Sequence, residues 1–333
     1  MRAKNDSAIY RPDLGITVME YAEGNTMGFI GLEIMPIFRT GLSSASYPVI
    51  PKEALLSVPD TARAPRGRYN RGDWDYERGY FTTSEHGWEE PVDDSERALI
   101  EQEGSEGIGD FIATKRAWNH IMRSQEKRIA AKLFNASNFT AHSVSDEWDD
   151  ATNATPITDV NDGRSAFRLQ CGMLPDALVI SWNTFQDLKE CDQIVNRLKY
   201  TFPGIDINKM TSDQLAAVFD VPRVLIGGSV YNSNGKGLDA SVSDIWDDEY
   251  AALVKISTSP YITDPGVGRT FLWTEDSPQN PIVEQYREDG TRSDIFRVRH
   301  NTDEAFLQSK DDSGTVKSNI AAACVYLFDN ITS

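Results

Sequence analysis

The segment from Asp110 to Asn135 constrains the fold most, because it is the clearest helix in the chain. Its apolar residues recur at spacings near three and four, which places them on one face of a helix. They are Ile112, Trp118, Ile121, Met122, Ile129, Leu133 and Phe134. Asp110 suits the N-cap, and the basic residues of the second half suit the negative end of the helix dipole. The pattern predicts one long amphipathic helix.

Residues 59–91 have a different composition, in which arginine, aromatic and glycine residues alternate. The arginines and aromatics are Arg63, Arg66, Arg68, Arg71, Arg78, Tyr69, Trp74, Tyr76, Tyr80 and Phe81. This predicts a long two-stranded excursion with a turn near residues 70–73. A lone hairpin is marginally stable in water, so the excursion should lie on another surface. A protein–protein surface suits these residue types better than a platform for single-stranded nucleic acid, because acidic residues interrupt the stretch.

The next segment is strongly acidic. Residues 89–106 hold Glu89, Glu90, Asp93, Asp94, Glu96, Glu101, Glu103 and Glu106 against one basic residue, Arg97. If this segment is partly helical, it extends the long helix into one spine over residues 93–135. The glycines Gly104, Gly107 and Gly109 then indicate a break in that spine.

The second half of the chain reads as α/β. The expected strands are 177–180, 224–226, 282–286, 295–299 and 321–328, with a glycine-rich turn and a return strand within 232–247. Residues 184–198 form an expected helix, and Thr211 with Gln214 forms a candidate capping box. Residues 143–163 contain six acidic side chains and no basic one, which indicates a solvated loop or hairpin.

Length and charge narrow the class of protein. A chain of 333 residues exceeds the size of one growing core, so two domains or large excursions are expected. The net charge of −18 disfavours a sequence-reading nucleic-acid binder. Three cysteines without metal-like spacing exclude a disulfide scaffold and indicate a reducing compartment. No secretory signal or bilayer-length apolar stretch is visible, which predicts a soluble intracellular protein without a membrane partner.

The sequence offers little catalytic chemistry. It contains no nucleophile elbow or Walker loop, and the four histidines lie singly. We therefore expect no catalytic residue, no metal site and no cofactor. One alternative is an acidic carbohydrate-active enzyme, since Asp244, Asp247, Asp248 and Glu249 surround Trp246. That alternative requires a cleft at Trp246.

The order of elements resembles a tailed-bacteriophage major capsid protein of the Hong Kong 97-type fold, which encapsulin shells share. The resemblance rests on architecture and on several local segments. They are Tyr47-Pro48-Val49-Ile50-Pro51, Arg63-Ala64-Pro65, Glu126-Lys127-Arg128-Ile129-Ala130, Ala177-Leu178-Val179-Ile180-Ser181 and Val224-Leu225-Ile226-Gly227-Gly228.

The resemblance implies an α+β fold in five segments. These are an N-arm (1–45), an extended E-loop hairpin (46–92), a spine helix with the peripheral domain (93–172), an axial domain (173–280), and peripheral strands followed by a C-terminal strand that returns to the axial domain (281–333).

It also implies a function. The expected protein is a non-enzymatic virion subunit that assembles, in the host cytoplasm, into the icosahedral shell around a double-stranded DNA genome. Implied partners are copies of itself in hexamers and pentamers, a separate scaffold protein, a portal, decoration proteins, and packaged DNA without sequence-specific contacts. A scaffold is implied because few residues precede the E-loop, unless an extension was removed. An encapsulin-type compartment is the first alternative.

The charge pattern adds a hypothesis about inter-subunit contacts. We expect the excursion of one subunit, through Arg63, Arg66, Arg68, Arg71, Arg78 and Trp74, to lie over the acidic spine of its neighbour. The acidic residues concerned are Glu89, Glu90, Asp93, Asp94, Glu96, Glu101 and Glu103. Each exposed pair contributes only ~0.2–1 kcal/mol, so register arises from many repeated contacts.

Overall fold

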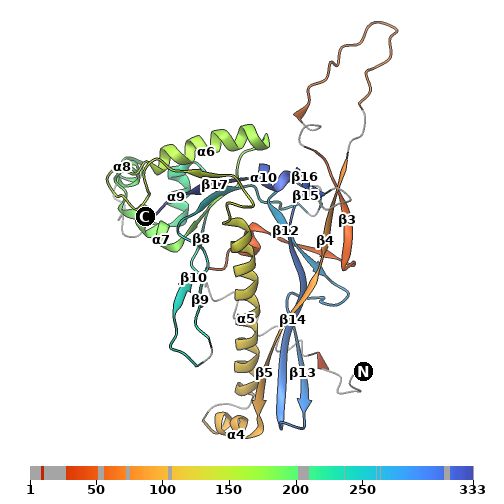
Figure 1. Ribbon diagram of the computed structural model, residues 1–333, viewed down its shortest axis with the longest axis vertical. Coiled ribbons are helices and arrows are strands. Elements are labelled where there is room, and N and C mark those ends of the chain that lie inside the picture. The colour runs from red at the N-terminus through yellow and green to blue at the C-terminus, as the bar shows by residue number, and fades with distance from the viewer. Residues whose placement is uncertain are drawn as a thin grey trace.

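The computed structural model describes residues 9–10, 28–51, 56–72, 76–103, 107–201, 210–235, 237–259, 261–262, 264–310 and 316–332. Its helices are α2 (Gly31–Ile34), α4 (Asp94–Glu103), α5 (Ile108–Leu133), α6 (Pro156–Cys171), α7 (Trp182–Glu190), α8 (Asp192–Thr201), α9 (Ser212–Phe219) and α10 (Ile320–Ala323). Figure 1 shows an elongated molecule in which α5 runs along the long axis.

Two larger sheets organise the strands. The five-stranded sheet has the order β6 (Ala141–Ser143), β17 (Val325–Asp329), β11 (Ala251–Val254), β7 (Ala177–Ser181) and β8 (Val224–Gly227). The six-stranded sheet runs β1 (Ile9–Tyr10), β13 (Ile282–Glu288), β14 (Ser293–Phe306), β12 (Gly268–Trp273) and β2 (Ile37–Thr40), with β5 (Ser84–Asp93) also on β14. Three hairpins pair β3 (Ser44–Val49) with β4 (Glu77–Thr82), β9 (Val230–Asn232) with β10 (Val242–Asp244), and β15 (Gln308–Lys310) with β16 (Val316–Asn319).

The five-stranded sheet is buried on both faces. Along β7, Leu178 and Ile180 contribute to the core beneath α6 to α9, whereas Ala177 and Val179 contribute to the core beneath α5. Side chains alternate between the two faces of a strand, so a strand covered on both sides is apolar throughout. All five residues of β7 are accordingly buried.

Helix α5 packs on both larger sheets. Its first half places Ala117, Trp118 and Ile121 against Val283 and Val298 of the six-stranded sheet. Its second half places residues such as Ile129 and Leu133 in the core of the five-stranded sheet. The helix is therefore the spine that connects the two parts (Figure 1).

A buried carboxylate fixes the middle of this spine. Glu126 Oε1 accepts hydrogen bonds from the Ile30 amide at 2.8 Å, the Gly31 amide at 3.1 Å and Trp246 Nε1 at 2.8 Å. Its Oε2 accepts from the Gly31 amide at 2.9 Å. Burial raises the pKa of Glu126, although these bonds oppose the shift. One side chain thus joins α2, α5 and the segment after β10.

A second buried network joins α5 to β14. Arg128 donates to both carboxylate oxygens of Glu304, at 2.8 and 2.9 Å, and Lys132 donates to the Glu304 carbonyl. Burial raises the pKa of Glu304, but the hydrogen bond and charge of Arg128, with the nearby His300 and Lys132, together outweigh burial and lower the pKa to about 2. Nearby, His300 of β14 is fully buried and lies opposite His86 of β5.

Many sequence predictions are confirmed. The long helix, the strand at 177–180, the antiparallel pair β13 and β14, and the turn with a return strand in β9 and β10 are all present. The capping box is complete, because Gln214 N donates to Thr211 Oγ1 and Thr211 N donates to Gln214 Oε1.

Several predictions are wrong in detail. Gly107, with a φ of 82°, caps α5 in place of Asp110, which bonds Arg97 instead. A solvated loop or hairpin was expected over 143–163, but its second part begins helix α6, because Val160 and Phe167 reach the core beside acidic neighbours. The helix expected at 184–198 is divided at Cys191, and residues 320–323 form α10 ahead of a shorter β17.

The strand pairing divides the chain differently from the expected segments. Elements β6 and α6 precede residue 172, yet they pack with the five-stranded sheet. Conversely β12, expected with the axial domain, pairs with β14 and β2. Strand β5, expected within the excursion, forms a ten-residue ladder with β14. The described helices include none with the length and apolarity that crossing a bilayer requires.

Gly227→Ala should destabilise the protein. A Cβ atom at Gly227 would lie 2.3 Å from ring atoms of the buried Trp246, so the core would have to shift. We expect the free energy of unfolding of the unassembled chain to fall by roughly 2–3 kcal/mol in urea titrations. Gly235→Ala is the control, because its Cβ meets nothing within 4 Å, and it should change stability by less than about 0.5 kcal/mol. Equal effects would contradict the packing.

Stability should fall as the pH drops below about 6.5, the usual histidine pKa. Burial, aided by Arg128, lowers the pKa of His300 to about 3. A histidine kept neutral by the fold stabilises it fully above its unfolded pKa and loses that contribution as the pH approaches the folded pKa. The expected loss from pH 7 to pH 5 is roughly 2 kcal/mol. Glu304, with its depressed pKa, adds its loss only below about pH 4.5.

The measurement is urea unfolding at pH 7 and pH 5 for the parent chain and for His300→Gln. The variant cannot gain this proton, so its loss between the two pH values should be smaller. His142→Gln, at an exposed histidine, is the control and should keep the parent pH dependence. If His300→Gln lost as much unfolding free energy between pH 7 and pH 5 as the parent chain, the acid sensitivity would belong to other groups.

Candidate assembly interface

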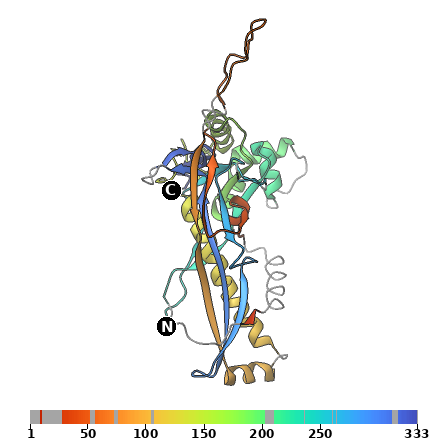
Figure 2. The ribbon, with the colours of Figure 1, turned by 90° about the vertical axis from the view of Figure 1, so that its right-hand side faces the viewer.

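The excursion predicted from the arginine-rich stretch is a loop that projects from a six-pair ladder. β3 and β4 pair from Ser44 with Thr82 to Val49 with Glu77. Between them, residues 56–72 extend away from both sheets, at the top of Figure 1, and Figure 2 shows the same extension edge-on. We call residues 56–72 the projecting loop.

Aromatic rings hold the base of this loop. The Phe81 ring stacks on Phe271 of β12, with centroids 4.2 Å apart, and the Tyr47 ring lies 5.8 Å from the same partner. Tyr47 also donates a hydrogen bond to the Phe306 carbonyl at 3.2 Å. Gly79 stands opposite Tyr47, where a Cβ would lie 2.3 Å from its ring. The loop therefore leaves the body in a direction that a packed cluster determines.

Among the described residues the turn of the loop lies at residues 64–67, whereas it was predicted near 70–73, a range whose last residue, Asp73, lies outside the described residues. The Gly67 amide donates to the Ala64 carbonyl at 2.9 Å, and Arg66 has a φ of 66°. Arg63 donates to the Gly67 carbonyl and lies 4.7 Å from the Tyr69 ring centroid. The turn lies further toward the N-terminus because the ladder pairs Val49 with Glu77, which centres the connection near residue 63.

The described residues leave the outer part of the projecting loop uncovered. Every residue from 56 to 72 is exposed. Val58 is 95% exposed and Tyr69 is 70% exposed, although both are apolar enough to favour burial. None of Arg63, Arg66, Arg68, Arg71 and Arg78 forms an ion pair with a carboxylate of the described residues. The loop presents cations and apolar side chains to a partner outside the chain.

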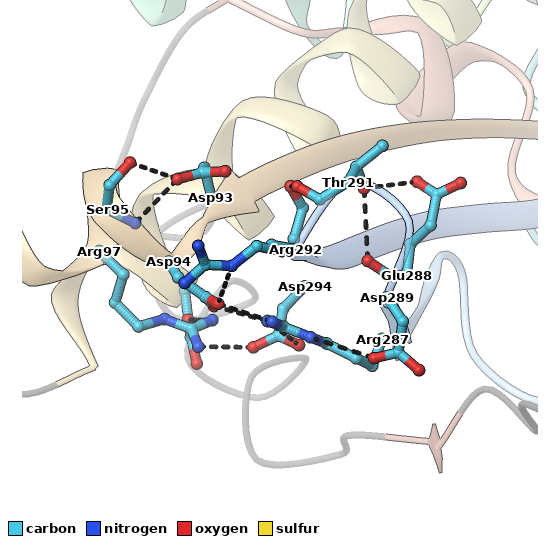
Figure 3. A network of polar contacts seen from close by, with 12 residues as sticks. Asp93, Asp94, Ser95, Arg97, Arg287, Glu288, Asp289, Thr291, Arg292 and Asp294 are labelled. Carbon is cyan, nitrogen blue, oxygen red and sulfur yellow. Dashed lines mark hydrogen bonds and ion pairs between the residues drawn. The ribbon is translucent and has the colours of Figure 1, made fainter.

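The acidic segment lies at the opposite end of the molecule, around α4 and the end of β5 (Figure 1). Figure 3 shows how closely its carboxylates are paired with arginines. Arg287 of β13 donates two hydrogen bonds to Asp94, at 2.6 and 2.7 Å. Arg97 bridges Asp294, at 2.5 Å, and Asp110, at 2.8 Å. These pairs tie α4 to both β14 and α5.

The pKa values in this network follow from the pairing. The hydrogen bond from Arg287 is the main cause that lowers the pKa of Asp94, and the same bond raises the pKa of Arg287. The Ser95 hydroxyl and amide lower the pKa of Asp93. All these groups are thus ionised at neutral pH, and the network is stable as charge pairs.

The remaining predicted acidic residues divide into paired residues, one exposed residue, and residues whose side chains are not described. Glu89 pairs with Arg297 at 2.7 Å, and Glu90 lies 3.6 Å from Arg116, so both have partners within the chain. Glu96 is exposed on α4. Trp74 lies outside the described residues, as do the side chains of Glu101 and Glu103. The structure places the loop arginines and the acidic end far apart within one chain.

Sites for small-molecule chemistry are sparse. Trp246 is fully buried and packs edge-to-face on Phe134, so the cleft that a carbohydrate-active enzyme would require there is absent among the described residues. The described side chains also include no group of three or more histidine, cysteine or acidic residues placed to hold a metal ion. A groove of about 910 Å³ lies between α5, β5 and the β9–β10 hairpin, with a mixed lining that includes Trp88, Arg116 and Lys127.

Sequence reasoning missed the residues that fix this arrangement. Glu126, beside Lys127, and Glu304, beside Asp303, look like ordinary surface residues in the sequence, but both are buried. The positions of Trp118, Ile121 and Ile129 define the apolar face of α5, and Glu126 follows Met122 by four residues on a flank of it. That spacing is the one signal that could have indicated its burial.

Comparisons with known proteins agree with this architecture. The chain is 26% identical to the major capsid protein of Burkholderia phage BcepMu over an alignment of 287 residues. The alignment covers 81% of this chain and 86% of that protein. No family model matches the chain.

Solved structures show the fold. A phage-related protein from Bordetella bronchiseptica RB50 aligns with a TM-score of 0.67 at 18% identity, over 98% of this chain and 99% of that chain. The virus-like particle from Pyrococcus furiosus aligns with a TM-score of 0.54 at 11% identity, over 96% of this chain and 98% of that chain. A structure from Mycobacterium phage Bobi aligns with a TM-score of 0.51 at 14% identity, over 90% of this chain and 89% of that chain. The chain therefore has the α+β Hong Kong 97-type capsid fold and is related in sequence to a phage major capsid protein, which confirms the resemblance noted in its sequence.

Proposed function

We propose that this chain is the major capsid protein of a tailed phage, which assembles with copies of itself into the icosahedral head shell around a double-stranded DNA genome. The observation that carries the proposal is the uncovered projecting loop. This segment has exposed Val58 and Tyr69, and its arginines form no ion pair with a carboxylate of the described residues. Aromatic rings inside the chain hold its base, and the described residues do not cover its outer part. A second copy of the chain supplies that cover. The role is structural, without catalysis.

The charge distribution supports contacts between copies. The loop arginines and the acidic end lie at opposite ends of one molecule, so they meet only between molecules (Figure 1). We propose that Arg63, Arg66, Arg68, Arg71 and Arg78 of one subunit lie over the acidic segment of its neighbour. Glu89, Glu90 and Asp94 already pair within the chain, so a neighbour's arginine extends an existing network. The exposed Glu96 is the carboxylate best placed to gain a new partner.

The fold suggests which parts take which roles. In this proposal the five-stranded sheet and its helices form the axial domain, and the six-stranded sheet with the first half of α5 forms the peripheral domain. Residues 1–45 form the N-arm. Assembly into pentamers and hexamers takes place in the host cytoplasm, with a scaffold protein, a portal and decoration proteins as further partners. The net charge of −18 disfavours tight DNA binding, so the packaged genome makes no sequence-specific contacts.

An encapsulin-type compartment is the alternative within the same fold. The sequence relationship to a phage major capsid protein favours the phage head. The contents of purified particles distinguish the two, because a phage head holds DNA whereas a compartment holds a cargo enzyme.

The test of assembly is light scattering coupled to size exclusion, with negative-stain imaging, over a concentration series. Rings, tubes or closed shells support the proposal. A compact monomer at every concentration, with residues 56–72 resistant to protease, would contradict it. A monomer whose loop is rapidly cleaved would show that the isolated chain lacks a scaffold, and adding the scaffold protein should then give shells.

Reversing charge on the loop should weaken assembly. In the double variant Arg66→Glu and Arg68→Glu, attraction to the acidic segment of a neighbour becomes repulsion. We expect the protein concentration needed for assembly to rise by roughly tenfold or more, since several weak pairs repeat around a closed shell. Parent assembly should also weaken as salt rises toward about 1 M, because salt screens exposed charges.

The matched control is Arg168→Glu with Lys199→Glu, at exposed residues on α6 and α8, which changes the net charge by the same amount. It should assemble near the parent concentration. If the loop variant assembled as the parent does, with the same salt dependence, the proposed pairing would be wrong while the shell function could stand.

A further inference from the structure

We propose that Cys171 and Cys324 form an intramolecular disulfide when the protein meets an oxidising environment. The two Sγ atoms lie 3.5 Å apart although the residues are 153 positions apart in the chain. Cys171 ends helix α6, and Cys324 lies between α10 and β17. Neither cysteine forms a disulfide bond in this structure, and both side chains are buried.

The backbone beside the two cysteines is already held in place. Gln170 Nε2 donates to the Ala322 carbonyl at 2.7 Å, which ties the residue before Cys171 to a residue two before Cys324. Forming the S–S bond of about 2.05 Å requires the sulfur atoms to approach by roughly 1.5 Å, which side-chain rotation can supply. The third cysteine, Cys191, is buried elsewhere and contacts the Ala154 carbonyl.

A small oxidant has a route to these thiols. Both cysteines line a largely apolar cavity of about 370 Å³ at the base of the projecting loop. Other lining residues come from that base, including Tyr47, Val49 and Leu56. Cys171 is 8% exposed and Cys324 is fully buried, so Cys171 meets the reagent first.

The reaction is a thiol–disulfide exchange with a small organic disulfide as the co-reactant. The Cys171 thiolate attacks one sulfur of that disulfide, forms a mixed disulfide and releases one small thiolate. The Cys324 thiolate then attacks the Cys171 sulfur and releases the second small thiolate. Both cysteine protons pass to the released thiolates, so two protein thiols are oxidised and one small disulfide is reduced to two thiols.

The buried setting makes this reaction slow. The contact with Cys171 and burial both raise the pKa of Cys324. Because the thiolate is the nucleophile, little of it is present at neutral pH. The rate should therefore rise with pH, and the thiols should stay reduced during synthesis in a reducing compartment.

The biological setting rests on the proposed function. A head shell is built in a reducing cytoplasm and then persists outside the host, where small disulfides and oxygen are present. Oxidation there would connect α6 to the C-terminal strand beneath the loop base. The bond would close a long stretch of chain and stabilise the folded subunit by restricting its unfolded state.

The test exposes the native full-length chain to 2-hydroxyethyl disulfide at pH 8 and counts free thiols after denaturation. The count should fall from three to one per chain, and a non-reducing peptide map should contain the 171–324 linked pair. The thermal transition should rise by on the order of 5 °C and return with dithiothreitol. Light scattering on the same samples reports assembly separately, so failure of one proposal does not imply failure of the other.

Variants keep the result unambiguous. Cys171→Ser and Cys324→Ser should each prevent the linked pair and the thermal shift, whereas Cys191→Ala should keep both. Retention of all three thiols in the folded chain, followed by reaction only after unfolding, would overturn the proposal. A linked pair that includes Cys191 would overturn it as well.

Discussion

The hydrogen bonds of the Glu126 carboxylate are the interaction on which the rest of the structure depends. The middle of α5 must lie beside α2 and beneath Trp246, and this carboxylate accepts from both. A buried carboxylate is costly unless donors surround it, and here backbone amides at the start of α2 and an indole supply them. Removing the Glu126 carboxylate would leave those buried donors without a partner, which costs free energy. This cost favours the observed position of α5 beside α2 and Trp246.

Helix α5 can then serve two cores at once. Its first half packs on β13 and β14, and its second half packs on the five-stranded sheet. The Arg128–Glu304 pair fixes the helix where the two halves meet. The same strand, β14, continues upward to pair with β12, whose Phe271 receives the rings at the loop base. The direction of the projecting loop is therefore coupled to the position of the spine through packed residues.

Local signals allowed much of the fold to be predicted from sequence. The three- and four-residue spacing of apolar residues revealed α5, a fully apolar run revealed β7, and the Thr211–Gln214 pair revealed the start of α9. Helix α6 was missed because its first half, with Asp159 and Asp162, continues an acidic stretch that begins at Asp146. Its boundary signals were present, with Pro156 in the first turn and Gly172 at the C-cap.

The paired character of the acidic segment could not be predicted. The partners of Asp94 and Glu89 are Arg287 and Arg297, which lie about two hundred residues further along the chain. Only the ladder of β5 with β14, and the pairing of β14 with β13, bring them together. Sequence composition therefore identified the acidic segment, but the arginines that pair with its carboxylates are brought there by the register of the strands.

The end of the β3–β4 ladder has a geometric consequence. Registered pairing stops at Val49 and Glu77, and the turn at Ala64–Gly67 has its own hydrogen bonds. The packed base thus fixes the direction in which the loop leaves the body, and among the described residues no ladder pair continues the hairpin between that base and the turn. In a closed shell built from five-fold and six-fold rings, neighbouring copies meet at different angles. A loop of this construction can accommodate that difference in curvature without disturbing either core, so one sequence can occupy non-equivalent positions in the same surface lattice.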